Sequence, residues 1–142
     1  MNHLVSLDAR AGELEKILSG VKTMLVKEFD PAQTMALSAN PGDSLYFLRD
    51  QDDCVVRVKA AVVRVLNFSK TFEDDPQHTL KEMQPRLQLT EDQFNFWAGK
   101  EPMQLVEFES AQKISVIQVA PRKTSGPVDW IAFETISQLM ER

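Results

Sequence analysis

The sequence has little cysteine, no long apolar run and no apparent leader, and each shortage excludes a class of protein. Cys54 is the single cysteine among 142 residues, so an intrachain disulfide and a multi-cysteine metal site are excluded, and a reducing compartment is expected. The longest apolar run, residues 55–66, is interrupted by Arg57, Lys59 and Arg64, so no segment is expected to span a membrane. The first residues show neither a basic nor a long apolar segment of a signal peptide, so the prediction is a cytoplasmic protein.

Positive charge is also scarce. Sixteen lysines and arginines stand against 21 acidic residues, which gives a net charge of −5 and argues against a surface coated with positive charge for duplex nucleic acid. A local basic groove is still compatible with this balance. The hydrophobic fraction of 43% and the charged fraction of 26% are those of an ordinary globular protein, and the length fits one domain over residues 1–142.

Motifs for cofactors, metals and nucleophilic catalysis are missing as well. The sequence contains no phosphate-binding loop of the P-loop type and no dinucleotide-binding fingerprint. His3 and His78 are far apart and have no partners at ligand spacing, so neither a metal nor another cofactor is expected. No base lies near a serine, threonine or cysteine in the local sequence. The acidic run 73–75 holds a candidate general base, with a solvated loop as the alternative.

The pattern of apolar residues predicts a chain rich in strands with a few short helices. The expected strands cover residues 3–7, 23–29, 44–49, 54–68, 103–108, 114–119 and 128–133, with residues 109–113 as a hairpin link between two of them. The expected helices begin after Asp8 and end at Gly20, begin at Thr79 and are cut to one or two turns by Pro85, begin at Thr90 and end at Gly99, and close the chain over 135–140.

The long strand carries the prediction of the fold. Alternate residues from Val56 to Val62, three valines and Ala60, form one apolar face, but Val63 and Val65 continue the apolar pattern on the opposite parity. A slip of one residue indicates a bulge or a strand that bends, which a small curved barrel requires. Together with the order of the motifs described below, this slip predicts an α+β domain: a small, mixed, curved β-barrel of five to seven strands with peripheral helices, one of them between the first two strands.

The candidate site residues are basic or aromatic. Lys22 follows a glycine at the predicted end of a helix and enters a strand, where it can offer donors to a ligand; a solvated surface lysine is the alternative. Basic residues near an exposed aromatic are typical of sites for single-stranded nucleic acid. Trp97 is predicted to be a core residue, and Trp130 is either a core or a ligand-contacting residue.

Four short motifs in this order resemble an ASCH domain, a branch of the PUA-like superfamily. They are Gly20-Val21-Lys22, Pro41-Gly42-Asp43, the long strand 55–66 and Gly126-Pro127-Val128-Asp129-Trp130. The likeness extends over roughly residues 3–134. It implies a PUA-like fold, a ligand-facing cleft near Lys22 and binding of RNA.

The sequence departs from the motif of the family at two positions. Leu25 stands where the motif has glutamate and where the family's acetylcytidine amidohydrolases have threonine, and Lys27 stands where it has arginine. A leucine can neither attack nor orient a water. The leading hypothesis is therefore a non-catalytic module that binds RNA or a nucleotide-like ligand. The expected contacts are Lys22, Thr23, Lys27, Arg57, Lys59, Lys123 and Trp130.

Two other functions are carried as alternatives. One is an amidohydrolase acting on a modified nucleoside, with Lys22 and an acidic partner such as Glu73. The other is a protein-interaction module whose acidic surface meets a basic protein partner.

Overall fold

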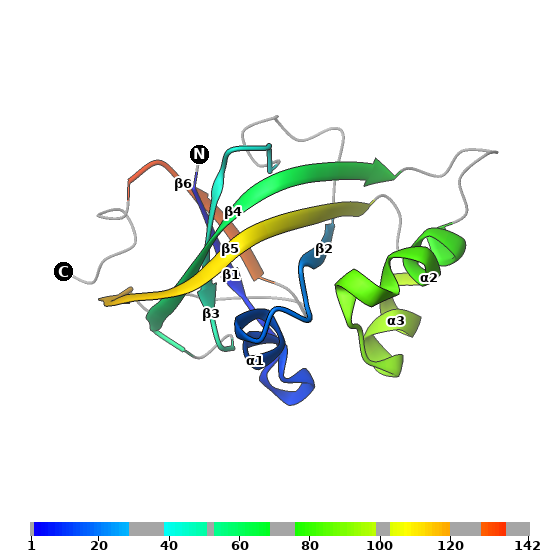
Figure 1. Cartoon of the computed structure of the whole chain (residues 1–142), viewed down its shortest axis with the longest axis horizontal. Helices are drawn as coiled ribbons and strands as arrows, with labels where there is room; N and C mark the ends of the chain where they lie inside the picture. Colours follow the sequence, from blue (N-terminus) through cyan, green and yellow to red (C-terminus); the bar gives the residue numbers. More distant parts are fainter. Residues whose placement is uncertain are drawn as a thin grey trace.

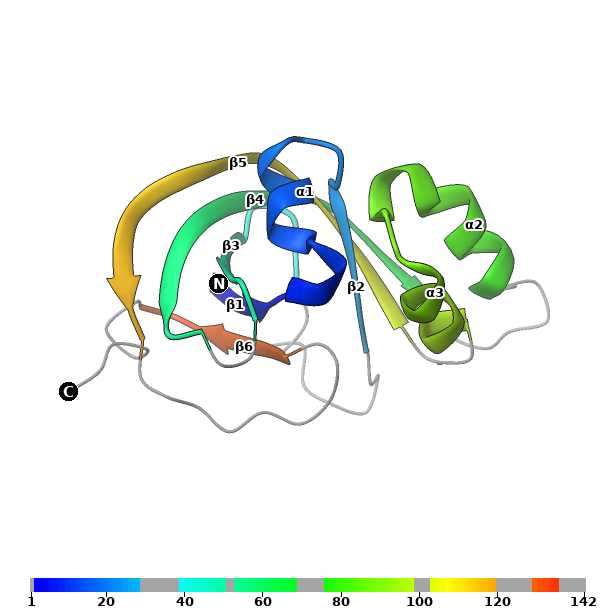
Figure 2. The same cartoon turned by 90° about the horizontal axis from the view of Figure 1, so that it is seen from below.

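Six strands form one mixed sheet that curls strongly into a half-barrel (Figures 1 and 2). The structure is a computed structural model and describes residues 2–28, 39–50, 53–68, 76–98, 103–119 and 129–135. Its elements are β1 Asn2–Ser6, η1 Ala9–Ala11, α1 Glu13–Leu18, β2 Met24–Glu28, β3 Ser44–Leu48, β4 Val55–Phe68, α2 Pro76–Leu87, α3 Glu91–Ala98, β5 Met103–Gln118 and β6 Asp129–Phe133. The predicted class, a small curved mixed barrel with a helix between the first two strands, is confirmed.

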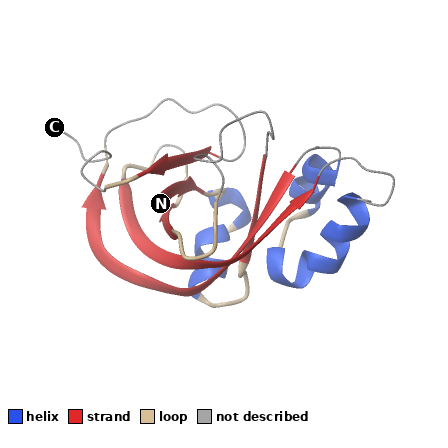
Figure 3. Ribbon diagram, turned by 90° about the horizontal axis from the view of Figure 1, so that it is seen from above, coloured by secondary structure: helices blue, strands red, loops and turns tan. Residues whose placement is uncertain are grey.

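The order of the strands places β2 at one edge of the sheet and β6 at the other. The sheet runs β2-β5-β4-β3-β1-β6, and β1 and β3 are parallel while the other neighbours are antiparallel. The helices α2 and α3 lie together at one end of the molecule (Figure 3). No helix in the described ranges is long and apolar enough to cross a membrane.

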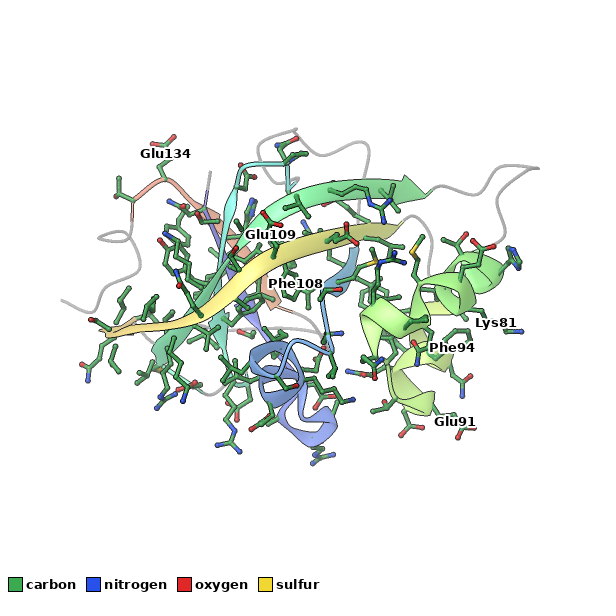
Figure 4. All side chains as sticks on the ribbon, viewed as in Figure 1. Lys81, Glu91, Phe94, Phe108, Glu109 and Glu134 are labelled. Atoms are coloured by element: carbon green, nitrogen blue, oxygen red, sulfur yellow. The ribbon has the colours of Figure 1, made fainter. Side chains whose placement is uncertain are left out.

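The two long strands, β4 and β5, bend together. Their register shifts at three places, and the shift between Val62 and Arg64 is the predicted slip in the long strand. The prediction of two strands joined by a hairpin at 109–113 is wrong, because these residues stay paired with β4, as in Glu109↔Ala61. Ser110 has a φ of 59°, which bends β5 without ending it. Phe108 and Glu109, labelled in Figure 4, come directly before this bend, and the first is buried while the second is exposed.

The helices differ from the prediction in their bounds. The expected helix after Asp8 is split, because Gly12 (φ 65°) separates η1 from α1. The helix expected near Thr79 begins at Pro76 and runs through Pro85 for 12 residues. Pro85 lies in its last turn, so the helix ends two residues after the proline, which removes one backbone donor from the helix.

The remaining predicted elements agree with the structure to within one residue at their described ends, and the other ends fall outside the described residues. The capping box at Thr90 is present: its hydroxyl accepts from the Gln93 N–H at 3.2 Å, and the Gln93 side chain accepts from the Thr90 N–H at 3.0 Å. Gly99, the basic loop 122–127 and residues 136–140 of the predicted closing helix lie outside those residues.

Side chains of β2 divide between two cores. Leu25 packs inside the half-barrel with residues such as Val5, Phe47 and Phe108. Met24 and Val26 face the opposite way and pack with residues of α2, α3 and the segment between them. Successive side chains of a strand alternate in direction, so Lys27 shares the inner face with Leu25.

Candidate functional site

Two buried lysines lie along the β2 segment of the chain. Lys22 comes two residues before β2 and exposes 1% of its surface, and Lys27 lies within β2 and exposes 9%. The alternative of a solvated Lys22 is therefore wrong. Lysines are rarely buried without partners, because burial removes the ammonium from water. Each lysine belongs to a separate cluster of polar groups.

Lys22 is held in a pocket between α1, β1, β2 and the segment around α2 and α3. The chain reaches it through Gly20, whose φ of 84° ends α1. The Lys22 ammonium donates to the carbonyl oxygen of Leu87 and lies 3.3 Å from Oε2 of Glu13, itself only 6% exposed. The other oxygen of Glu13 accepts from the backbone N–H of Asp8 at 2.8 Å. Glu13 is therefore a fixed counter-charge.

A small cavity adjoins this ion pair. Its volume is about 20 Å³, roughly the space needed for one water. Besides Glu13 and Lys22, it is lined by Val5, Ser6, Leu7, Leu25, Val26, Leu89, Gln93 and Trp97. Burial lowers the pKa of Lys22, and the neighbouring Glu13 carboxylate opposes this effect. The pocket combines a desolvated cation, a carboxylate and space for a molecule as small as water.

Lys27 belongs to a second cluster, which we call the edge site and define as Lys27, Trp130, His3 and Asp43. The Lys27 ammonium lies 4.8 Å from the centre of the Trp130 ring, within the range of a cation–π contact. The Trp130 indole N–H donates to Nδ1 of His3 at 3.0 Å. On the other side of the imidazole, Nε2 lies 2.8 Å from Oδ2 of Asp43. Four segments of the chain thus meet at one connected set of polar groups.

The hydrogen bonds of the edge site determine the tautomer of His3. Because Nδ1 of His3 accepts from the indole, the proton of the neutral ring is on Nε2, which donates to Asp43. Burial lowers the pKa of His3 despite the nearby carboxylate. Burial alone would raise the pKa of Asp43, but hydrogen bonds from His3 and the Asn40 N–H lower it. Burial lowers the pKa of Lys27 from 10.5 to about 8.

The edge site lies where the two ends of the curled sheet approach each other. Lys27 comes from β2 and Trp130 from β6, the two edge strands, which do not pair with each other within the described residues. The lysine–indole contact therefore crosses the open side of the half-barrel (Figures 2 and 3). Trp130 is only partly buried, and it packs against the inner core.

Solved structures of an ASCH protein from Zymomonas mobilis have a fold similar to that of this chain along nearly its whole length. The ASCH protein itself is 15% identical and matches over 96% of this chain and 91% of its own, with a TM-score of 0.63. A serine-to-alanine mutant of that protein, ZmASCH, is 16% identical and gives a TM-score of 0.64 over the same coverage. A tyrosine-to-phenylalanine mutant, also 16% identical, covers 96% of this chain and 94% of its own, with a TM-score of 0.61. This chain has an ASCH-like fold.

The structural likeness confirms the ASCH resemblance proposed from four short motifs. No protein-family model matches the sequence, and no curated protein matches it either. At this level of identity the likeness establishes the fold of the chain and leaves its activity to the chemistry of its own residues.

The ASCH-like fold brings together only part of the predicted site. Lys27 and Trp130 meet at the edge site, whereas Lys22 faces Glu13 in its own pocket. Thr23 is half-buried, and its backbone N–H and C=O bond to the Arg86 carbonyl and the Phe108 N–H.

The other predicted contacts have different surroundings. Arg57 is exposed and pairs with Asp53 at 3.2 Å. Lys59 lies 5.4 Å from the centre of the Tyr46 ring. Lys123 and the proposed acid Glu73 fall outside the described residues.

Three important residues were not predicted from the sequence. Glu13, His3 and Asp43 are buried and polar, and each bonds to a residue of the predicted site or to its neighbour. Asp43 was visible as the last residue of the Pro-Gly-Asp turn. His3 had no local signal, because its indole partner lies 127 positions away along the chain.

Proposed function

We propose that this domain binds RNA or a nucleotide-like ligand, without catalysing a reaction, at the edge site. The observation that carries the proposal is the Lys27 ammonium over the Trp130 ring, contributed by opposite edges of the half-barrel. A cation beside an aromatic face can contact a phosphate and stack a base at once. The resemblance to ASCH domains supports the same class of ligand.

The burial of Lys27 supports a role in binding an anion. Taking the ammonium out of water lowers its pKa to about 8, so the charged form is less stable than in water although it still predominates near pH 7. A phosphate brought to this position would favour the charged form and would interact in a medium of lower dielectric constant than water. Hydrogen bonds to charged groups contribute about 1.5–3 kcal/mol each.

The proposed ligand is a short single strand or one nucleotide. Arg57 and Lys59 have partners other than the edge site, and the net charge of −5 gives no general attraction for nucleic acid. Few phosphates would therefore be neutralised, so binding should depend only weakly on salt. The weak salt dependence would distinguish this domain from a protein that binds along a long strand of RNA.

Fluorescence anisotropy with a fluorescein-labelled single-stranded RNA of mixed sequence tests the proposal at two salt concentrations. Unlabelled mononucleotides serve as competitors. We expect Lys27→Met to weaken binding about tenfold or more, from the loss of one charged contact. Lys59→Met is the matched control, because Lys59 also lies over an aromatic ring but outside the edge site. Equal affinity of Lys27→Met and the wild type would overturn the proposal.

The Lys22 pocket supports a second candidate, an amidohydrolase that acts on a modified nucleoside. The lowered pKa of Lys22, the Glu13 carboxylate at 3.3 Å and the adjoining cavity are features of sites for acid–base chemistry. Against it, the cavity is the size of one water, and Leu25 lines it. We therefore place binding first.

A further inference from the structure

We infer that His3 and Asp43 are positioning residues that fix the Trp130 indole at the edge site, and that ligand binding there requires a neutral His3. The inference rests on the proposed function, because it concerns how the same site is held ready. It adds that acidification weakens ligand binding at the edge site.

The hydrogen bonds from Trp130 to Asp43 form a continuous line. The indole has one polar group, and that group donates to Nδ1 of a histidine with 0% exposure. The two rings are 5.6 Å apart between centroids and inclined by 54°, so the imidazole also supports the indole by direct contact. In the β1–β6 ladder, His3 is paired with Ala132 and Trp130 with Val5, so the two rings are diagonal neighbours on one face.

Asp43 fixes the imidazole in turn. Its Oδ2 atom receives Nε2–H of His3 and also the backbone N–H of Asn40 at 3.0 Å. The turn that carries Asp43 is tied to β4, because the Gly42 N–H bonds to the Val62 carbonyl and the Val62 N–H to the Asp43 carbonyl. The side chains of His3 and Asp43 thus connect the Trp130 indole to β4 in the wall of the half-barrel.

A second proton on His3 conflicts with this arrangement. It can only go to Nδ1, which already receives the indole N–H, and two donors would then face each other. The Trp130 ring must lose its hydrogen bond and its fixed orientation. The ligand would then meet an indole that is no longer held beside Lys27.

The charged groups around His3 set the direction of the pH effect. Asp43 faces it from the turn before β3, Lys27 from β2 and the indole from β6, and the positive charge of the amino terminus also acts on it. The carboxylate favours the protonated ring, but burial and the two positive groups oppose it, so the pKa of His3 lies below 6.5. The ring is neutral near pH 7, and the predicted loss of binding occurs below pH 6.5.

Two substitutions at His3 separate its two hydrogen bonds. His3→Asn places an amide oxygen near the position of Nδ1, so it can accept from Trp130 but cannot titrate. His3→Gln extends its amide toward Asp43, so it can keep the donor and loses the acceptor for the indole. We expect His3→Asn to bind the labelled RNA more tightly than His3→Gln but more weakly than wild type, because it gives up the bond to Asp43, and with no pH dependence between neutrality and acid. We expect His3→Gln to bind roughly fivefold more weakly than wild type, the equivalent of one hydrogen bond.

Indole fluorescence of the free protein tests the positioning role without any ligand. In a Trp97→Phe background, Trp130 is the only indole, and protonation of the adjacent imidazole should change its emission with a midpoint below pH 6.5. The step should be absent in both His3 variants, and far-UV circular dichroism checks that each stays folded. Trp130→Phe keeps an aromatic ring without the N–H, so its binding should lose the pH dependence even if both His3 variants fail to fold.

The outcomes separate the two proposals. An emission step that depends on His3, with no RNA binding at any pH, would support the positioning role and overturn the proposed function. RNA binding that is equal in wild type, His3→Asn and His3→Gln and insensitive to acid would overturn the positioning role and leave the function standing. If the His3 variants do not fold, Trp130→Phe decides the matter: RNA binding that keeps the pH dependence of the wild type in this variant would overturn the positioning role.

Discussion

Replacing Lys27 by methionine should make the protein more stable while it weakens binding. The two side chains are similar in length, but methionine carries no charge to desolvate. A fall in the pKa of Lys27 from 10.5 to about 8 corresponds to a penalty of about 3 kcal/mol, since each pKa unit is about 1.4 kcal/mol. The contact with the Trp130 ring offsets about 1 kcal/mol of this penalty. Lys27 also makes a further interaction that offsets part of the penalty, so we expect Lys27→Met to raise the free energy of unfolding by at most about 2 kcal/mol near pH 7.

The pH dependence follows from the same lowered pKa. Below pH 8 the folded and unfolded chains both hold the proton, so the penalty on the folded state is fully present. Between pH 8 and 10.5 the unfolded chain binds more protons than the folded one, so the stability of the wild type rises with pH. The advantage of Lys27→Met should be largest below pH 8 and should shrink as the pH approaches 10.5.

Urea unfolding followed by circular dichroism, at about pH 7 and about pH 9.5, measures both effects. Lys59→Met is the control, because Lys59 is half-buried over Tyr46 and its replacement should change stability by no more than about 0.5 kcal/mol. A Lys27→Met protein that is less stable than wild type at pH 7, or an advantage that does not change with pH, would refute the reasoning.

Three further predictions concern the Lys22 pocket and the helices. Lys22→Ala leaves Glu13 buried without its cation and should lower the free energy of unfolding by about 3 kcal/mol, as measured by urea unfolding. The double variant Lys22→Met, Glu13→Gln removes both charges and should recover most of this lost stability. A double variant as unstable as the single one would contradict this expectation. Thr90→Ala removes one half of a capping box and should cost about 1 kcal/mol by the same measurement, with no change in unfolding midpoint as the contrary result. Chromatography should detect no release of cytidine from acetylcytidine, because Leu25 lines the cavity where a hydroxyl would be needed; release that disappears in Lys22→Met would show that the pocket is catalytic.

The sequence was most informative where the barrel has one buried and one exposed face. Alternation and the slip near Val62 predicted the long bent strand and, together with the order of the motifs, a small curved barrel. The polar residues 109–113 were misleading, because an exposed strand and a hairpin turn have similar composition. The structure shows that these residues continue β5 because β4 supplies hydrogen-bond partners, and such pairing between distant segments has no local signature.

The candidate site was predictable only in part. Strand parity correctly placed Leu25 and Lys27 on the same face of β2. The burial of Lys22 was not predicted, because a lysine after a helix end is usually solvated and its partner Glu13 lies in the helix that precedes it. The contact of His3 with Trp130 depends on the pairing of the first and last strands, which requires the complete topology.

The irregular register between β4 and β5 has a consequence for how this domain can diversify. Each bulge adds local twist to the strands that carry it. Within the described residues no ladder joins β2 to β6, so the span from Lys27 to Trp130 depends on the accumulated curl of the intervening strands. Insertions or deletions at these bulges would change the distance between Lys27 and Trp130 without changing the identity of any residue of the edge site. For the proposed ligand, the size and the chemistry that the site accepts would thus be set by different parts of the chain.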